Sequence, residues 1–369
     1  MNPIQFFRPW LPPWDEVEPK LRAAHESGVL TSGPFVKELE ETLADMLGAR
    51  HVICCANATL GMTILLDVAL PDCPRVIVPG YTFAATQQAV EWAGGDWLWA
   101  DVGEDCNIDV EAAAKDWQGL ADAVLAVHVS GNPCDCRGLA DAFPDIPVFY
   151  DAAHALGALY EGLYVTKWGA ASVLSLGVTK IIAAGGEGGA VVTDDDKIAA
   201  GVRLAINHGR EAGSMDCMIR GTNARMQEYS AAYALACLPH LEMLIQRRRD
   251  IRSRYLAGLA GIDGIAFPPE RAGCRATWKD CTVFVDGATT GWDADGLAEA
   301  LCLQGIGVRR YYDPPAHQTT WMQSCHGGNP PSLPVTELLA AQAVTLPCYP
   351  DLTDEEVSRV IDTTRSLLG

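Results

Sequence analysis

The chain has few basic residues and no long uninterrupted apolar run. Among its 369 residues, 27 Lys and Arg stand against 47 Asp and Glu, which gives a formal net charge of −20 at pH 7. Nucleic acids and anionic membrane surfaces are bound through clustered Lys and Arg, so we expect neither as a partner. No apolar stretch reaches the roughly 20 residues that span a bilayer, and residues 1–13 lack the pattern of a secretory signal. We therefore expect a cytoplasmic protein.

The cysteine spacing of a structural zinc site is also missing. The 13 cysteines are odd in number and irregularly spaced. Cys134 and Cys136 form a CxC pair and Cys54 and Cys55 are adjacent, whereas structural zinc sites commonly use CxxC pairs. We expect reduced thiols that pack as small apolar side chains, and no metal site.

What the chain does contain is a regular alternation of apolar strands and amphipathic helices. The predicted strands are 51–55, 75–78, 97–102, 123–129, 147–151, 171–176 and 189–193. The predicted helices between and before them are 14–27, 35–47, 58–69, 82–93 and one that starts at 110–114. This alternation is typical of parallel βαβ units, and it predicts an open α/β sheet.

The pattern changes in the last third of the chain. A single long helix is predicted over 227–259. It is followed by predicted strands at 280–284 and 308–310 and predicted helices at 294–304, 335–344 and 354–367. A chain of this length exceeds what one small core can organise. We therefore divide it into residues 1–250, an N-terminal arm with a large α/β domain, and residues 251–369, a smaller α+β domain.

Asp151 and Lys180 are the two residues that indicate a chemistry. Asp151 closes the apolar run 146–150, and Lys180 lies on a later loop of small residues. A lysine amine can form a Schiff base with the aldehyde of pyridoxal 5′-phosphate (PLP). An aspartate beside the pyridinium nitrogen keeps that nitrogen protonated, so that the ring can accept electrons. Ligands of open α/β sheets collect at the carboxyl ends of strands, where both residues are predicted to lie.

Short runs spread over most of the chain resemble one family in order. They are 31–34, 56–59, 78–86, 107–109, 127–131, 151–158, 175–180, 186–189, 207–209, 222–226 and 346–350. From near Leu30 to its end the chain resembles the DegT/DnrJ/EryC1/StrS family of PLP-dependent sugar aminotransferases. The resemblance implies aspartate aminotransferase fold type I. In that fold, a large PLP-binding domain with a mostly parallel sheet between helices precedes a smaller C-terminal α+β domain.

The resemblance also implies how the cofactor is held. Ala58 and Thr59 begin a predicted helix, where N–H groups and the helix dipole suit a phosphate. Ser175 matches a second phosphate contact, and Phe83 matches an aromatic residue that stacks on the pyridine ring. His154 stands where relatives often carry Gln beside the 3′-oxygen of PLP, and its protonation depends on pH.

Two further implications concern Lys180 and the neighbouring subunit. Lys180 carries PLP and then moves protons to and from the substrate carbon, which requires a neutral amine. Asn223 resembles a residue that reaches the PLP phosphate of the neighbouring subunit, so we expect a homodimer with a shared active site. Arg225 lies nearby, and a site role and a structural ion pair are equally open for it.

The substrate is expected to meet residues of the C-terminal segment. Arg309, Tyr311, Tyr312 and His317 resemble the part that closes over the substrate, and His208 is a further candidate for the same cleft. Surface or packing roles for these residues stay open.

The leading hypothesis is transfer of an amino group from glutamate or glutamine to a keto group of a sugar, expected to be a nucleotide-linked keto-deoxysugar. One alternative keeps PLP but aminates a keto-cyclitol or dehydrates a sugar. Dehydratases of this group that do not transfer an amino group replace the lysine by His, and Lys180 is retained here. Another alternative is a non-catalytic regulator on the same scaffold, for which a broken site would be expected.

Overall fold

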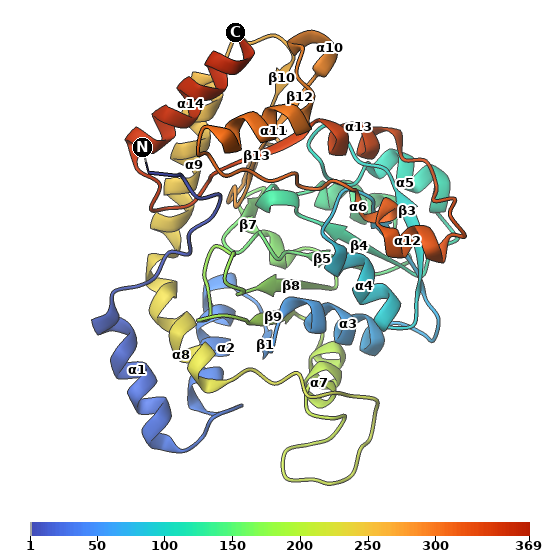
Figure 1. Ribbon diagram of the computed structural model, residues 1–369. Coiled ribbons are helices and arrows are strands. Elements are labelled where there is room, and N and C mark those ends of the chain that lie inside the picture. Colours follow the sequence, from blue (N-terminus) through green and yellow to red (C-terminus); the bar gives the residue numbers. More distant parts are fainter. Residues whose placement is uncertain (1) are drawn as a thin grey trace.

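A seven-stranded sheet organises the first two thirds of the chain in the computed structural model, which describes residues 2–369 (Figure 1). Its strands are β1 (His51–Cys55), β2 (Arg75–Pro79), β3 (Asp96–Ala100), β4 (Ala123–Val127), β5 (Val148–Asp151), β8 (Ala171–Ser175) and β9 (Gly189–Thr193). The order is β1-β9-β8-β5-β4-β2-β3. The run from β3 to β8 is parallel, and only β9 pairs antiparallel, with both β8 and β1. The predicted, mostly parallel sheet is confirmed.

Helices cover both faces of this sheet, which explains why its strands are apolar on both sides. Alternate residues point to opposite faces: Val52 and Cys54 of β1 join one core cluster, and Ile53 and Cys55 join the other. The helices of the large sheet are α1 (Trp14–Ser27), α2 (Pro34–Leu47), α3 (Ala58–Ala69), α4 (Ala84–Trp92), α5 (Val110–Trp117), α6 (Cys136–Ala142), α7 (Asp196–Ala205) and α8 (Glu228–Cys237).

A second, antiparallel sheet lies near the C-terminal end of the chain. It consists of β10 (Ile265–Ala266), β12 (Cys281–Val285) and β13 (Ala343–Leu346) in the order β10-β12-β13. Its core cluster includes residues of α9, α11 and α14, whose ribbons lie together at the top of Figure 1. The helices of this part are α9 (Leu241–Gly258), α10 (Gly287–Thr290), α11 (Ala294–Leu303), α12 (Thr320–Cys325), α13 (Pro334–Gln342) and α14 (Asp354–Leu368).

The sequence analysis did not predict a third, small sheet, because each of its strands has only two residues. The strands are β6 (Leu159–Tyr160), β7 (Leu163–Tyr164) and β11 (Cys274–Arg275), in the order β11-β6-β7. Because β11 pairs with β6, this sheet ties the chain after α9 back to the segment that follows Asp151.

Three local predictions were wrong. The single helix expected over 227–259 is α8, a 3₁₀ turn at Leu238–His240 and α9, because Pro239 has no N–H to continue the α-helical ladder. The helix expected over 335–344 ends at Gln342, and the chain continues directly as β13. The strand expected at 308–310 makes only one bridge, between Arg309 and Thr345.

Within residues 2–369, no helix combines the length and the apolarity that crossing a bilayer requires.

A buried carboxylate joins two helices of the large sheet. Glu228 opens α8 and is fully buried, and it accepts the backbone N–H groups of Gly33, Phe35 and Val36 at 2.8, 2.8 and 3.0 Å. These N–H groups belong to the start of α2, which has no side-chain cap of its own. Glu228 therefore satisfies donors that the helix itself cannot.

We predict that Glu228→Ala lowers the free energy of unfolding by about 2 to 4 kcal/mol, because three buried donors lose a charged acceptor. Glu26→Ala, at an exposed position of α1, is the control and should change it by less than about 0.5 kcal/mol. Urea denaturation followed by circular dichroism measures both. Equal stability of the two variants would contradict the capping role.

Candidate active site

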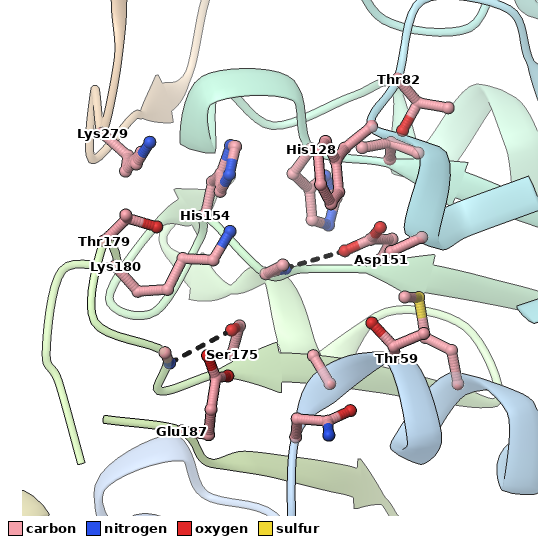
Figure 2. A pocket seen from close by; sticks show the side chains of 18 of the residues that line it. Thr59, Thr82, His128, Asp151, His154, Ser175, Thr179, Lys180, Glu187 and Lys279 are labelled. Atoms are coloured by element: carbon pink, nitrogen blue, oxygen red, sulfur yellow. Dashed lines mark hydrogen bonds between the residues drawn. The ribbon is translucent and has the colours of Figure 1, made fainter. Parts of the chain in front are cut away.

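A cavity of about 650 Å³ opens at the carboxyl ends of the parallel strands (Figure 2). Asp151 and Ser175 are the last residues of β5 and β8, and His128 directly follows β4. The structure brings to this cavity most of the residues predicted to hold a cofactor or contact a substrate. They are Ala58, Thr59, Phe83, Asp151, His154, Ser175, Lys180, Tyr311 and Tyr312.

Asp151 lies on the cavity floor, and its side chain is held from two sides. Its Oδ2 accepts the hydroxyl of Thr86 at 2.8 Å, and its Oδ1 accepts the N–H of Ala153 at 3.0 Å. The Thr86 hydroxyl is also 2.8 Å from that of Thr82. Burial raises the pKa of Asp151, whereas Thr86, Ala153 and nearby Lys180 oppose that rise. The carboxylate is therefore oriented before any ligand arrives.

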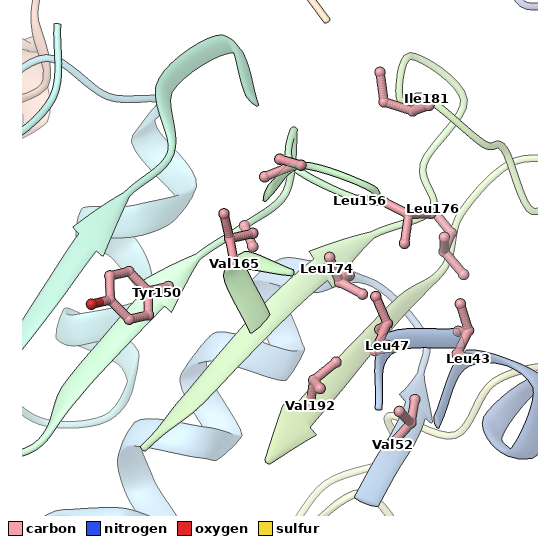
Figure 3. Close-up of a cluster of buried hydrophobic side chains, with 14 of the residues drawn as sticks. Leu43, Leu47, Val52, Tyr150, Leu156, Val165, Leu174, Leu176, Ile181 and Val192 are labelled. Atoms are coloured by element: carbon pink, nitrogen blue, oxygen red, sulfur yellow. The ribbon is translucent and has the colours of Figure 1, made fainter. Parts of the chain in front are cut away.

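The loop that carries Lys180 is anchored in the hydrophobic core on both sides. Leu176 precedes the lysine and Ile181 follows it, and both pack into the cluster that includes Leu174 and Leu156 (Figure 3). The N–H of Lys180 donates to the carbonyl of Gly177 at 2.9 Å. These contacts hold the lysine backbone while its amine extends into the cavity (Figure 2).

The amine of Lys180 is tuned toward neutrality. Burial and, after it, the cation of Lys279 lower the pKa of Lys180 to about 8, against the opposing charges of Asp151, Asp280 and Glu187. Lys180 therefore holds a much larger neutral fraction near pH 7 to 8 than an ordinary lysine does, as a nucleophile or general base requires.

The start of α3 lies at the cavity wall. The side chain of Asn57 caps this helix by accepting the N–H of Leu60 at 2.9 Å. The first N–H groups of a helix have no acceptor inside it, and those of Ala58 and Thr59 begin α3 at the cavity wall. Together with the helix dipole and the nearby hydroxyl of Ser175, they suit a phosphate.

His154 is a neutral imidazole in this setting. Burial lowers its pKa well below the ordinary value, and the cations Lys180 and Lys279 lower it further. Its Nδ1 lies 3.8 Å from Oδ2 of Asp280. A neutral imidazole has one N–H to donate, so it can make a single donor contact of the kind that an amide NH₂ group makes.

Several cavity residues were not assigned to the site from the sequence. Lys279, Thr179, Glu187 and Thr82 line the cavity, and Thr86 supports Asp151 from behind. Lys279 just precedes β12 of the small sheet, and its backbone N–H donates to Ser130 at 2.9 Å. A lysine before a strand carries no local signal for a site, so only the packing of the two sheets reveals it.

Four predicted residues do not line the cavity of their own chain. Asn223 and His208 are exposed on the segment that follows α7, and the Oδ1 of Asn223 accepts from Arg225 at 3.2 Å. Arg309 lines an adjoining cavity. His317 is fully buried, with Nε2 3.4 Å from Glu337, so the structure gives it a packing position.

Among residues 2–369, one buried group of potential metal ligands includes His128 of the cavity lining. Ligand atoms of His128, Cys134 and Cys136 lie within 4.8 Å of one another. However, Nδ1 of His128 already accepts the N–H of Cys134 at 3.1 Å. Burial also raises the pKa of the Cys134 thiol well above its ordinary value, which favours the protonated form that does not bind metals. We read the group as part of the core.

We predict that Lys180 titrates near pH 8 in the cofactor-free protein, so that it reacts with amine reagents about two pH units below ordinary lysines. Lys279→Met should raise this pKa, because a neighbouring cation is removed. Labelling with acetic anhydride across pH 6–11, read by mass spectrometry, measures the profile of each lysine. Exposed Lys37 is the internal control, and a profile of Lys180 identical to that of Lys37 would refute the tuning.

Known proteins resemble this chain in sequence and in fold. A curated relative from Escherichia coli, dTDP-4-amino-4,6-dideoxy-D-glucose transaminase, is 30% identical over 99% of this chain and 98% of its own. The solved structure of DesI with its TDP-sugar product superposes with a TM-score of 0.91 at 33% identity, over 99% of this chain and 93% of that one. DesV of S. venezuelae gives a TM-score of 0.89 at 29% identity, covering 96% and 94% of the two chains.

The model of one protein family spans nearly the whole chain, from residue 15 to residue 365. The resemblance found in the sequence motifs, the predicted fold class and the predicted aminotransferase activity are thereby confirmed. The chain belongs to the DegT/DnrJ/EryC1/StrS aminotransferase family.

Proposed function

We propose that this aminotransferase uses PLP to move an amino group from glutamate or glutamine to a keto group of a nucleotide-linked sugar. The observation that carries the proposal is the placement of Lys180, Asp151 and the start of α3 around one cavity. The names of the relatives support the sugar class, since the E. coli protein is a dTDP-sugar transaminase and DesI was solved with a TDP-sugar.

The cavity residues fit the cofactor. An amine, a buried carboxylate and unsatisfied helix N–H groups are the partners required by an aldehyde, a pyridine nitrogen and a phosphate, respectively. NtdA of Bacillus subtilis is 25% identical to this chain, over 96% of this chain and 82% of the NtdA chain. It was solved with bound PMP, the amine form of the cofactor. When bound, PLP supplies the aldehyde that takes up the amino group and a ring that accepts the electron pair released at the substrate carbon.

Each of these residues has one role in the proposed reaction. The Asp151 carboxylate, oriented by Thr86, holds a proton at the ring nitrogen. Ala58, Thr59 and Ser175 bind the phosphate. Phe83, which is exposed at the cavity wall, covers one face of the ring. Once the amino donor has displaced it, the neutral Nζ of Lys180 takes a proton from the substrate carbon and returns one.

The active site is shared between two subunits in our proposal. Asn223 is exposed and lies outside the cavity of its own chain, so its NH₂ group can reach the phosphate site of a partner subunit.

We also propose that the chain divides into a large domain, residues 1–250, and a small domain from residue 251 that carries the second sheet. The 13 free cysteines fit a reducing compartment, and we place the protein in the cytoplasm.

We predict that Lys180→Ala abolishes amino transfer and the visible absorbance band of lysine-bound PLP. The reason is that Lys180 is expected both to carry the cofactor and to move the proton, whereas Lys279, the other lysine of the cavity, donates to Asp280. Lys37→Ala, an exposed lysine of α2 paired with Glu41, should keep both. Spectra and amino transfer from glutamate or glutamine to keto-sugar nucleotides, read by mass spectrometry, test this. Transfer by the Lys180 variant would overturn the proposal.

Mixing two inactive variants tests the shared site. Asn223→Asp places a carboxylate where the partner's phosphate is expected, so it should inactivate the homodimer. Mixed dimers with Lys180→Ala contain one intact site, so random reassociation should recover about a quarter of the wild-type activity. An active Asn223→Asp enzyme, or no recovery after mixing, would contradict the shared site. Reassociation itself is checked by native mass spectrometry.

A further inference from the structure

A second, smaller cavity of about 190 Å³ adjoins the active site. Thr179, Lys279 and Tyr311 line both cavities, so the second one continues the first beyond Lys180. Phe6 of the N-terminal arm borders it, with its ring edge-on to Tyr311 at a centroid distance of 5.6 Å. Arg248 of α9 and Arg309 complete the polar lining, and we call this space the arginine cavity.

The arginine cavity has more positive than negative side chains. It is lined by the cations Arg248, Lys279 and Arg309 and by one carboxylate, Asp280. Asp280 is partly engaged: its Oδ1 accepts from Nζ of Lys279 at 2.7 Å, whereas its buried Oδ2 has no hydrogen-bond partner among the described residues. One carboxylate therefore stands against three cations in this cavity. Within residues 2–369, neither arginine forms an ion pair: Arg248 donates to the carbonyl of Leu244 at 3.2 Å and Arg309 to that of Val308 at 3.1 Å.

The burial of Arg248 makes its positive charge unfavourable unless a negative charge lies close by. Its side chain is 2% exposed, and its Nε has no hydrogen-bond partner among the described residues. Taking a cation out of water without an opposite charge is unfavourable. In a protein of net charge −20, a buried arginine without an ion pair beside the active site makes this cavity suited to an anion.

The dimensions of the cavity narrow the choice of anion. Its volume of about 190 Å³ is less than a third of the roughly 650 Å³ of the main cavity. A carboxylate with its neighbouring methylene groups fits this space, whereas a nucleoside diphosphate does not. Arginine also pairs with carboxylates through two parallel hydrogen bonds.

We propose that the arginine cavity binds the distal carboxylate of a dicarboxylate amino donor, so that the enzyme prefers glutamate to glutamine. The inference rests on the proposed aminotransferase reaction, which needs an amino acid at Lys180. From there the donor's side chain can extend past Thr179 and Lys279 toward Arg309. Arg248 and Arg309 then pair with the carboxylate oxygens, and an amide in its place would leave these cations unpaired.

The first test compares amino donors on the PLP-loaded wild-type enzyme. Conversion to the PMP form is followed by absorbance with glutamate, glutamine and alanine. We expect glutamate to have a kcat/KM at least about tenfold above that of glutamine, since hydrogen bonds between charged groups are the stronger ones. Equal values for glutamate and glutamine would overturn the inference.

The second test removes one cation at an exposed position, where folding is not at risk. Arg309→Gln should lower kcat/KM for glutamate by about tenfold to a hundredfold and change that for glutamine by less than about twofold. Arg309→Lys should recover part of the loss. Arg22→Gln, an exposed arginine of α1 paired with Glu18, is the matched control and should change neither value. Equal losses for both donors, or a loss confined to the keto-sugar half-reaction, would refute the assignment.

A binding measurement separates the cavity from the chemistry. Glutarate, an unreactive dicarboxylate, is titrated into the PLP-loaded enzyme by calorimetry. We expect it to bind wild type and Arg22→Gln alike and Arg309→Gln about tenfold more weakly. If Arg309→Gln binds glutarate as tightly as wild type does, this inference is wrong and the proposed function is unaffected. If no donor produces the PMP form, the proposed function falls and this inference with it.

Discussion

A carboxylate and an amine that face one cavity from two neighbouring strand ends are the constraint on which the rest of the site depends. Burial raises the pKa of Asp151, and the hydroxyl of Thr86, the N–H of Ala153 and the nearby Lys180 oppose that rise. Burial and Lys279 lower the pKa of Lys180, and Asp151 opposes that lowering. Each group therefore favours the charged form of the other, against the effect of burial.

The surrounding fold supplies rigidity where this pair requires it. Asp151 is the last residue of β5, a central parallel strand, and the loop of Lys180 is fixed by Leu176 and Ile181 in the core. The start of α3, with the N–H groups of Ala58 and Thr59, faces them across the cavity. The loops that follow parallel strands all lie at the same edge of the sheet. A ligand at that edge is therefore contacted by several segments that are distant in sequence.

The balance of charge at the site differs from that of the whole chain. The chain is strongly acidic, whereas the two connected cavities are lined by four basic side chains, Lys180, Lys279, Arg248 and Arg309, and three carboxylates, Asp151, Glu187 and Asp280. Charges in the protein interior are screened less than charges at the surface, because the interior has a lower dielectric constant than water. The basic side chains of the cavities therefore attract anions more strongly than isolated basic residues on the surface do. Anionic cofactors and substrates are then drawn to this place rather than to the surface at large.

The amino-acid sequence by itself determined the alternation of strands and helices, the strand-end position of Asp151 and the family motifs, because these depend on local spacing. Periodicity could not reveal the continuation of α13 as β13, since apolar runs suit both helix and strand. Pro239, by contrast, marks the break between α8 and α9 in the sequence itself. Only the tertiary structure decided that Lys279, Thr86 and Arg248 meet the two cavities or Asp151 and that His317 does not. Lys279 and Arg248 reach their places through the packing of β12 and α9, and Thr86 through that of α4, and no local pattern records contacts between segments so far apart.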